Sequence, residues 1–155
     1  MRDTTLCFLQ KDNKLLLGMK KRGFGQGKYN GFGGKLQEGE TIIQGVLREL
    51  KEECGIQVQE DNGEKKAELS FVFPHKPEFD QKVHVYIFKE WQNQPQESDE
   101  MQPQWFEFSK IPFDKMWKDD PYWLPRVLHG EELVGNFTFA EDGETIQEFK
   151  LKRKE

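Results

Sequence analysis

The chain has 155 residues, and its 23 basic and 28 acidic side chains give a net charge of −5. That length suits one domain, and the acidic balance argues against a general nucleic-acid coat, because binding phosphates needs a positive field. Hydrophobic residues make up 35% of the chain, and its 13 Phe, 4 Trp and 3 Tyr can supply a small core.

No apolar run approaches the roughly 20 residues that cross a bilayer. The first ten residues, MRDTTLCFLQ, lack the long apolar stretch of a signal peptide. Cys7 and Cys54 both lie in apolar patterns, as reduced thiols do. We therefore expect one cytoplasmic domain that acts as a monomer and binds neither membrane nor nucleic acid.

Short apolar and β-branched runs predict strands along most of the chain. They lie at residues 4–9, 14–22, 56–58, 69–73, 83–88 and 105–108, with a closing hairpin of 133–139 and 145–151. Residues 92–104 are polar and predict a loop without core residues. Because strands outnumber helices and do not alternate with them, the expected class is α+β.

Two segments predict helices. Residues 41–54 are amphipathic, and Gly55 follows at the usual stop position. A second helix is expected from Asp120, as a side-chain N-cap, with Pro121 at the first helical position, to about Gly130. Six glycines between residues 23 and 34 argue against regular helix there and would let the backbone approach a ligand closely.

The first helix carries a stripe of carboxylates. At about 100° per residue, Glu49, Glu52 and Glu53 fall within roughly 100° of arc, beside an apolar stripe. Arg48 and Lys51 lie off this stripe and are not expected to neutralise it. A solvated charged face would explain the acids alone. Clustered carboxylates next to a glycine-rich loop are instead typical of a Mg²⁺ site that bridges to phosphates.

The spacing within this region is specific. From Gly34, five residues lead to Glu40, and seven more lead to RELKEECGI at 48–56. This is the pattern G-x5-E-x7-R-E-U-x-E-E-x-G-U, where U is a bulky aliphatic residue, and it resembles the Nudix box. The resemblance implies a single Nudix hydrolase domain over 1–155, with the box at 34–56. It also implies a mixed β-sheet flanked by the box helix and a second helix, in an α/β/α sandwich.

Three segments narrow the resemblance, which runs from about Thr4 to Leu151. LLLGMKKRGFGQGKYNGFGGKLQEGET, ESDEM and MWKDDPYW are similar to the family members that hydrolyse oxidised purine nucleoside triphosphates. The implied reaction converts 8-oxo-dGTP or 2-oxo-dATP to the monophosphate and pyrophosphate, which cleans the nucleotide pool. Two alternatives stay open: another Nudix substrate, such as a methylated purine triphosphate or a dinucleoside polyphosphate, and a non-catalytic nucleotide-binding module.

The resemblance also implies a metal site. Its ligands would be the Gly33 carbonyl and the carboxylates of Glu49, Glu52, Glu53 and Glu100, holding Mg²⁺ or, in its place, Mn²⁺. Glu53 is expected to polarise the attacking water, although the base varies among Nudix enzymes. Arg48, grouped with the catalytic residues, is expected to orient the glutamates through paired hydrogen bonds, and Glu40 to have a structural role. Without the resemblance, Glu100 is an ordinary loop acid.

A base pocket is expected around Asn30, Trp117, Asp119 and Asp120. The asparagine amide offers a donor and an acceptor, and the indole a stacking face. The other implied substrate contacts are Thr4, Lys20, Phe24, Phe32, Gly33, Gly34, Lys35, Phe71 and Lys118, with Phe73 as a further wall. A purely structural role is the alternative for several of these residues. Asp120 could cap a helix, the phenylalanines could pack in the core, and Thr4 could lie on an edge strand. Lys21, Arg22 and Lys28 could simply face solvent.

If both aspartates are buried near one base, repulsion and desolvation raise at least one pKa. A protonated acid can donate a hydrogen bond, so a switch of protonation would let one pocket accept oxidised guanine and oxidised adenine. Two departures from the family pattern, Tyr29 for a tryptophan and Lys118 for a proline, put the relative substrate preference in doubt.

Overall fold

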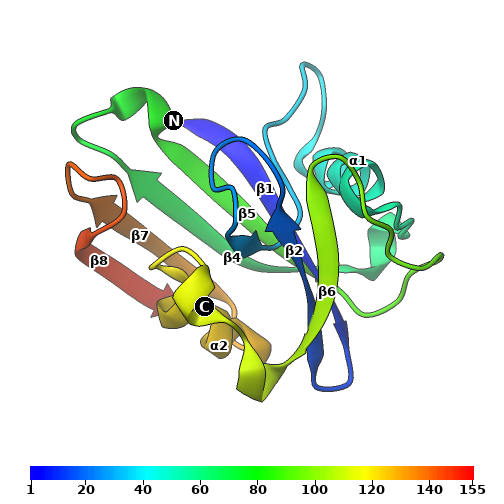
Figure 1. Cartoon of the computed structure of the whole chain (residues 1–155). Helices are drawn as coiled ribbons and strands as arrows, with labels where there is room; N and C mark the ends of the chain where they lie inside the picture. The colour runs from blue at the N-terminus through cyan, green and yellow to red at the C-terminus, as the bar shows by residue number, and fades with distance from the viewer.

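Eight strands form one mixed sheet in the computed structural model, which describes residues 1–155 (Figure 1). The strands are β1 (Arg2–Lys11), β2 (Lys14–Lys20), β3 (Tyr29–Asn30), β4 (Gly63–Val72), β5 (Gln81–Phe88), β6 (Met101–Glu107), β7 (Leu133–Phe139) and β8 (Ile146–Arg153). Their order is β3-β2-β1-β5-β4-β7-β8, and β6 pairs with β2. The β1–β5 and β4–β7 pairs are parallel, and the other pairs are antiparallel.

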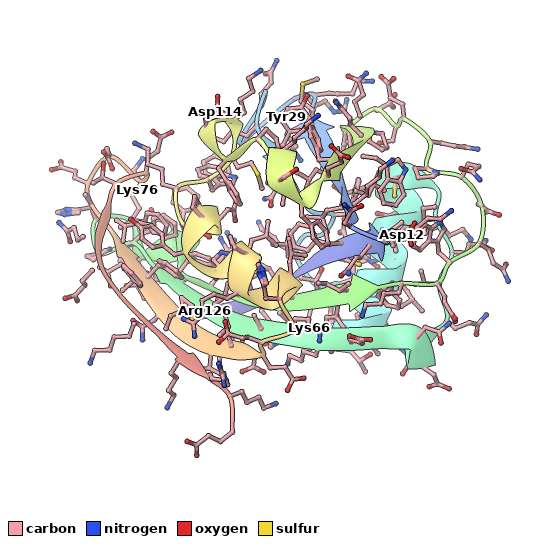
Figure 2. The ribbon with its side chains drawn as sticks, turned by 90° about the horizontal axis from the view of Figure 1, so that it is seen from below. Asp12, Tyr29, Lys66, Lys76, Asp114 and Arg126 are labelled. Carbon is pink, nitrogen blue, oxygen red and sulfur yellow. The ribbon has the colours of Figure 1, made fainter.

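Two helices, α1 (Ile42–Cys54) and α2 (Asp120–Leu128), cover opposite faces of the sheet. Along β1, Phe8 packs in the cluster that contains the apolar side of α2, whereas Cys7 and Leu9 pack in the cluster beneath α1. Figure 2 shows α2, labelled by Arg126, lying across the sheet. The α+β class and the helix–sheet–helix layering are therefore confirmed. Neither helix has the length and apolar character that crossing a membrane requires.

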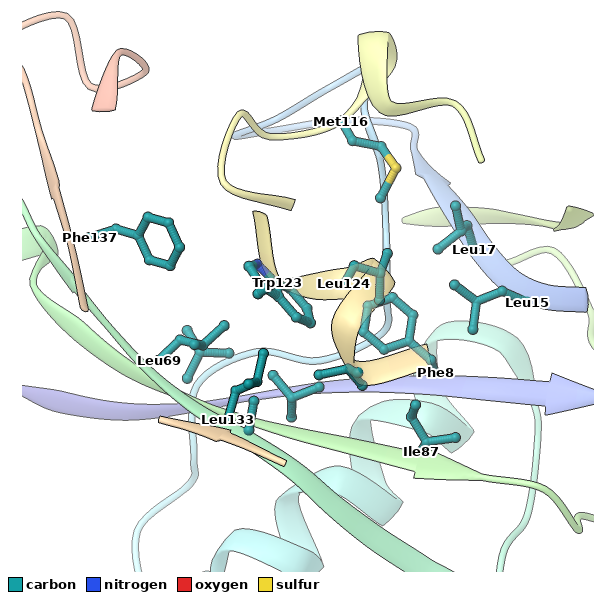
Figure 3. Close-up of a cluster of buried hydrophobic side chains, with 14 of the residues drawn as sticks. Phe8, Leu15, Leu17, Leu69, Ile87, Met116, Trp123, Leu124, Leu133 and Phe137 are labelled. Carbon is teal, nitrogen blue, oxygen red and sulfur yellow. The ribbon is translucent and has the colours of Figure 1, made fainter. Parts of the chain in front are cut away.

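The larger core lies between the sheet and α2 (Figure 3). Trp123 is 1% exposed, and its ring lies 6.2 Å from that of Phe8. Burying one large apolar side chain stabilises a fold by about 1.5–3 kcal/mol, so this cluster fixes α2 and the segment before it. The smaller core fixes α1 through Val46, Leu50 and Cys54.

Local sequence signals explain where α1 begins and where it ends. The Thr41 hydroxyl accepts from the Gln44 N–H, and the Gln44 side chain accepts from the Thr41 N–H, which forms a capping box. Gly55 ends the helix at φ 74°, a conformation that glycine adopts without strain. Both expected ends of this helix are confirmed.

One strand prediction and one loop prediction were wrong. Residues 56–58 make only an isolated bridge, between Gln57 and Gln92, and the next strand begins at Gly63 after a short 3-10 turn. The loop expected over 92–104 ends early, because β6 begins at Met101, which is 3% exposed and packs beneath α1. Pairing along the whole of β2 explains this longer strand.

Candidate active site

The glycine-rich segment after β3 crosses from β2 to β1. The Phe32 N–H donates to the Cys7 carbonyl at 2.8 Å, and the Thr5 N–H donates to the Gly34 carbonyl at 2.9 Å. A Cβ at Gly33 would lie 1.9 Å from the Thr5 carbonyl oxygen, so only glycine fits there. A Cβ at Gly34 would lie 3.0 Å from a carboxylate oxygen of Glu49. This close approach brings both glycines to the acidic side of α1.

Glu53 faces this glycine pair from α1. Its carboxylate accepts the Gly33 N–H at 2.7 Å and is only 5% exposed. Burial raises the pKa of Glu53 to about 8, and the charge of Glu49 adds to the rise, whereas the Gly33 hydrogen bond opposes it. In the metal-free protein this carboxyl group therefore keeps its proton to a higher pH than an ordinary glutamate does, and a bound cation would favour its ionised form.

Arg48 links the carboxylates of the helix. Its guanidinium donates to Glu49 at 2.8 Å and to Glu52 at 3.3 Å. It also forms a fork with Glu40, at 2.7 and 3.0 Å, and donates to the Lys35 carbonyl at 3.0 Å. The expectation that Arg48 leaves the carboxylate stripe unneutralised was wrong, because its long side chain reaches across to that stripe. Its orienting contacts and the structural contact of Glu40 are as expected.

Replacing Arg48 with lysine is expected to lower kcat at least tenfold and the free energy of unfolding by about 1–3 kcal/mol, because lysine cannot reproduce the fork. The matched control is Arg126→Lys, since Arg126 makes the same kind of fork with Glu131 at 3.0 and 3.0 Å. Urea unfolding and steady-state kinetics on both variants measure the two effects. An equal loss of kcat in both variants would contradict the orienting role.

The donor chemistry of this region fits a hard divalent cation. Burial raises the pKa of Glu49, and the charges of Glu52 and Glu100 raise it further, so the acids lie close enough to repel one another. A bound cation would relieve this repulsion. However, no three acids, histidines or cysteines already lie close enough to hold one ion together. The structure thus gathers the expected ligands in one region without a preformed cage.

Glu100 reaches this region from the other side of β2. It lies just before β6, its side chain is about half exposed, and one carboxylate oxygen lies 3.7 Å from the Lys20 ammonium. Its charge raises the pKa of both Glu49 and Glu53. Chain positions nearly fifty residues apart are thus brought together, which no local pattern indicates.

An aromatic group surrounds Trp117. The Phe24 ring stacks on it at 5.1 Å although Phe24 is 79% exposed, and the Lys28 ammonium lies 5.1 Å from the indole centroid. Phe79 stacks on Phe24 at 6.4 Å. Phe79 was missed by the sequence reasoning, since it lies in a short 3-10 turn that has no periodic pattern. Lys28 does not simply face solvent, because it also approaches Glu144 at 4.0 Å.

Phe71 and Phe73 lie further along the same aromatic system. Phe71 stacks on Phe137 at 5.6 Å, and Phe73 stacks on Phe139 at 5.0 Å. Both are partly buried against the larger core. Both side chains therefore pack in the core, as the structural alternative predicted. Phe73 is linked to Trp117 through ring contacts with Phe79 and Phe24.

Asp119 and Asp120 are both buried, at 5% and 2% exposed. The Trp123 indole N–H donates to Asp119 at 2.8 Å, whereas one carboxylate oxygen of Asp120 has no partner. Burial raises the pKa of Asp119 to about 6 and that of Asp120 well above its usual range. The predicted cap was wrong: Asp119 occupies the N-cap position without a side-chain cap, and Asp120 is inside the helix.

The remaining residues predicted to bind substrate differ in their hydrogen bonds and in their burial. The Thr4 hydroxyl donates to the Gln81 side chain at 2.9 Å, and the Asn30 side chain accepts the Gly31 N–H at 2.9 Å. Phe32 is fully buried beneath α1, so its side chain is a core residue, which corrects the expectation of substrate contact. Lys35 and Lys118 are exposed.

One cavity of about 470 Å³ has a lining that includes Leu47, Lys51, Ile56, Val58 and Trp91. It contains none of the predicted site residues. The acidic side chains gather instead at the carboxylate stripe, and stacking side chains gather at the Trp117 group, which consists of Trp117, Phe24, Phe79 and Lys28.

Comparisons with known proteins agree with this geometry. A family model described as the NUDIX domain matches residues 1–127. The chain is 46% identical over 148 residues to the oxidized purine nucleoside triphosphate hydrolase of Mus musculus, covering 96% of this chain and 92% of that protein. It is 46% identical over 151 residues to the protein of the same name from Danio rerio, covering 97% and 94%. The crystal structure of a MutT mutator protein from Bacillus halodurans matches with a TM-score of 0.84 and 27% identity, over 97% of both chains. The chain therefore belongs to the Nudix family.

Proposed function

We propose that the protein hydrolyses oxidised purine nucleoside triphosphates, such as 8-oxo-dGTP and 2-oxo-dATP, to the monophosphate and pyrophosphate. This removes damaged precursors from the nucleotide pool. The observation that carries the proposal is the buried pair Asp119 and Asp120 next to Trp117, because the free oxygen of Asp120 is a costly feature unless a ligand pairs with it. The names of the mouse and zebrafish relatives support the same substrate class.

In this proposal, Asp119 and Asp120 recognise the edge of the base and Trp117 stacks on its face. Phe24 covers the indole in the structure and lies between Gly23 and Gly25, both with positive φ, at 79° and 84°. The purine would lie against the Trp117 group. Phe24 would either move aside or stack on the purine. The Asn30 amide supplies further hydrogen bonds to the purine.

The carboxylate stripe supplies the chemistry. Glu49, Glu52, Glu53, Glu100 and the Gly33 carbonyl would hold Mg²⁺, or Mn²⁺ in its place, and the cation would neutralise charge on the phosphates and polarise water. Glu53 accepts the proton of the water that attacks phosphorus, as the phosphoanhydride bond breaks and pyrophosphate leaves. Arg48 keeps Glu49 and Glu52 in place through its hydrogen bonds. Lys20 and Lys35 are suited to contact phosphate oxygens.

The test is a panel of triphosphates assayed for release of monophosphate and pyrophosphate with and without Mg²⁺. The proposal expects 8-oxo-dGTP and 2-oxo-dATP to give a kcat/KM well above that of dGTP and dATP. A higher value for a methylated purine triphosphate or a dinucleoside polyphosphate would favour another Nudix activity. Tight nucleotide binding without turnover would favour a non-catalytic module.

We further propose that the enzyme works as a monomer in the cytoplasm and binds neither membrane nor nucleic acid. The support is the net charge of −5 and the two buried, unpaired cysteines, which suit a reducing compartment. Sedimentation equilibrium and cell fractionation test these statements directly.

A further inference from the structure

Lys21, the first residue after β2, forms hydrogen bonds to the segment that carries Glu100. Its ammonium donates to the Glu97 carboxylate at 2.5 Å and to the Ser98 carbonyl at 2.9 Å. Its backbone N–H donates to the Glu100 carbonyl at 2.8 Å. Three hydrogen bonds from one residue thus reach three positions of residues 97–100, so Lys21 does not simply face solvent.

The same segment forms a tight turn around Ser98. The Ser98 hydroxyl accepts the N–H of Glu100 at 3.3 Å and that of Met101 at 3.1 Å, and the Ser98 N–H donates to the Met101 carbonyl at 3.0 Å. Met101 is 3% exposed and anchors the turn in the core beneath α1. The turn is therefore held from one side by the core and from the other by Lys21.

The Glu100 side chain has no such support of its own. It is about half exposed, and its ion-pair partner is Lys20, at 3.7 Å. Its position therefore depends on the backbone of residues 97–101. The ion pair between Lys21 and Glu97 is 34% and 52% exposed, and pairs this exposed contribute little to overall stability. Its effect is instead expected on local order in the turn.

We infer that Lys21 is a positioning residue that holds Glu100 in place as a ligand of the divalent cation. This inference rests on the proposed function, in which Glu100 is one of the metal ligands. Residues that orient a ligand from outside the coordination sphere change metal affinity without touching the metal. The Lys21 side chain acts on Glu100 through its bonds to the Glu97 carboxylate and the Ser98 carbonyl, and not through its own charge at the cation. The backbone bond to the Glu100 carbonyl remains in every Lys21 variant.

The test measures Mn²⁺ binding to the nucleotide-free protein, by the electron paramagnetic resonance signal of free Mn²⁺. Lys21→Ala is expected to weaken binding about tenfold, the lower end for such residues, while Lys21→Arg retains most of the affinity. Hydrogen exchange at the Glu100 and Met101 amides should also quicken in Lys21→Ala. The matched control is Lys65→Ala, because Lys65 makes a 2.6 Å ion pair with Glu68 of similar exposure, away from the site.

Mn²⁺ binding to Glu100→Gln is measured in parallel. It separates the statement that Glu100 is a metal ligand from the statement that Lys21 positions it. If Glu100→Gln weakens Mn²⁺ binding and Lys21→Ala does not, the positioning role is wrong while the metal site stands. If Glu100→Gln has no effect, Glu100 is not a ligand and both statements fail. If Lys65→Ala weakens binding as much as Lys21→Ala, the effect is one of general charge, and the inference is overturned.

Discussion

Glu53→Gln is expected to lower kcat by about 10²–10⁴-fold, the usual range for losing a general base, while the protein stays folded. Glutamine keeps the shape of the side chain, and its carbonyl can still accept the Gly33 N–H that Glu53 accepts at 2.7 Å. It cannot take a proton from water or bring negative charge to a cation. Steady-state kinetics with 8-oxo-dGTP and saturating Mg²⁺ measure the loss.

The same variant is expected to be more stable than the wild type at high pH. The pKa of Glu53 is about 8 in the fold, against about 4.5 for an ordinary glutamate, so ionisation opposes folding. This cost is absent below pH 4.5 and grows as the pH rises towards 8. Metal-free Glu53→Gln should therefore unfold at a higher temperature than wild type at pH 8, but not at pH 4.5.

Glu38→Gln, which changes an exposed glutamate outside the site, controls for the loss of one negative charge. A kcat within tenfold of wild type in folded Glu53→Gln would contradict the catalytic assignment. A lower melting temperature at pH 8 would show that the carboxylate is needed for the fold, and the kinetic loss would then need another explanation.

Local signals made the box helix predictable. The capping box of Thr41 and Gln44, the stop at Gly55 and the apolar stripe all depend on residues within a turn or two of one another. The spacing from Gly34 to Ile56 predicted which carboxylates gather near the glycines. Glu53 does contact Gly33, because the helix and the glycine segment both pack on β1.

Features that depend on distant contacts were not predictable. Arg48 lies off the carboxylate stripe by helical angle, yet a long flexible side chain can cross that angle. Phe32 follows glycine in a segment that reads as a loop, and only its pairing with Cys7 places it in the core. Lys21 and Phe79 have no sequence pattern, because their partners lie on segments far along the chain.

Asp119→Asn is expected to lower kcat/KM for 8-oxo-dGTP by about tenfold or more. The change turns one carboxylate oxygen that faces the base into an NH2 donor, and it removes the negative charge. Asparagine can still accept the Trp123 indole N–H that Asp119 accepts at 2.8 Å. Asp119→Ala is less informative, since it leaves that buried N–H unpaired and should also destabilise the fold by about 1–3 kcal/mol. A normal kcat/KM in folded Asp119→Asn would make the residue purely structural.

The stability of the aspartate variants has a defined pH dependence. Burial raises the pKa of Asp120 well above the ordinary value of 3.8, so its ionisation opposes folding as the pH rises above that value. Asp120→Asn should therefore gain melting temperature relative to wild type at pH 7 and show little gain near pH 3.5. Thermal unfolding at the two pH values measures this difference. A gain that is the same at both pH values would mean that the fold does not raise the pKa of Asp120.

Substrate choice is expected to follow the protonation of this pair. Oxidised guanine and oxidised adenine present different donors and acceptors, and one neutral acid beside one ionised acid supplies a donor and several acceptors. The two carboxyl groups interact, so they titrate as a unit, and burial raises the pKa of both above the ordinary aspartate value. The ratio of kcat/KM for 8-oxo-dGTP over 2-oxo-dATP should thus vary from pH 6 to 9 in the wild type.

In Asp119→Asn and Asp120→Asn the ratio should shift and its pH dependence should flatten, because asparagine keeps a permanent donor. A ratio that stays constant in the wild type and unchanged in both variants would rule out the protonation switch and leave the hydrolase proposal intact.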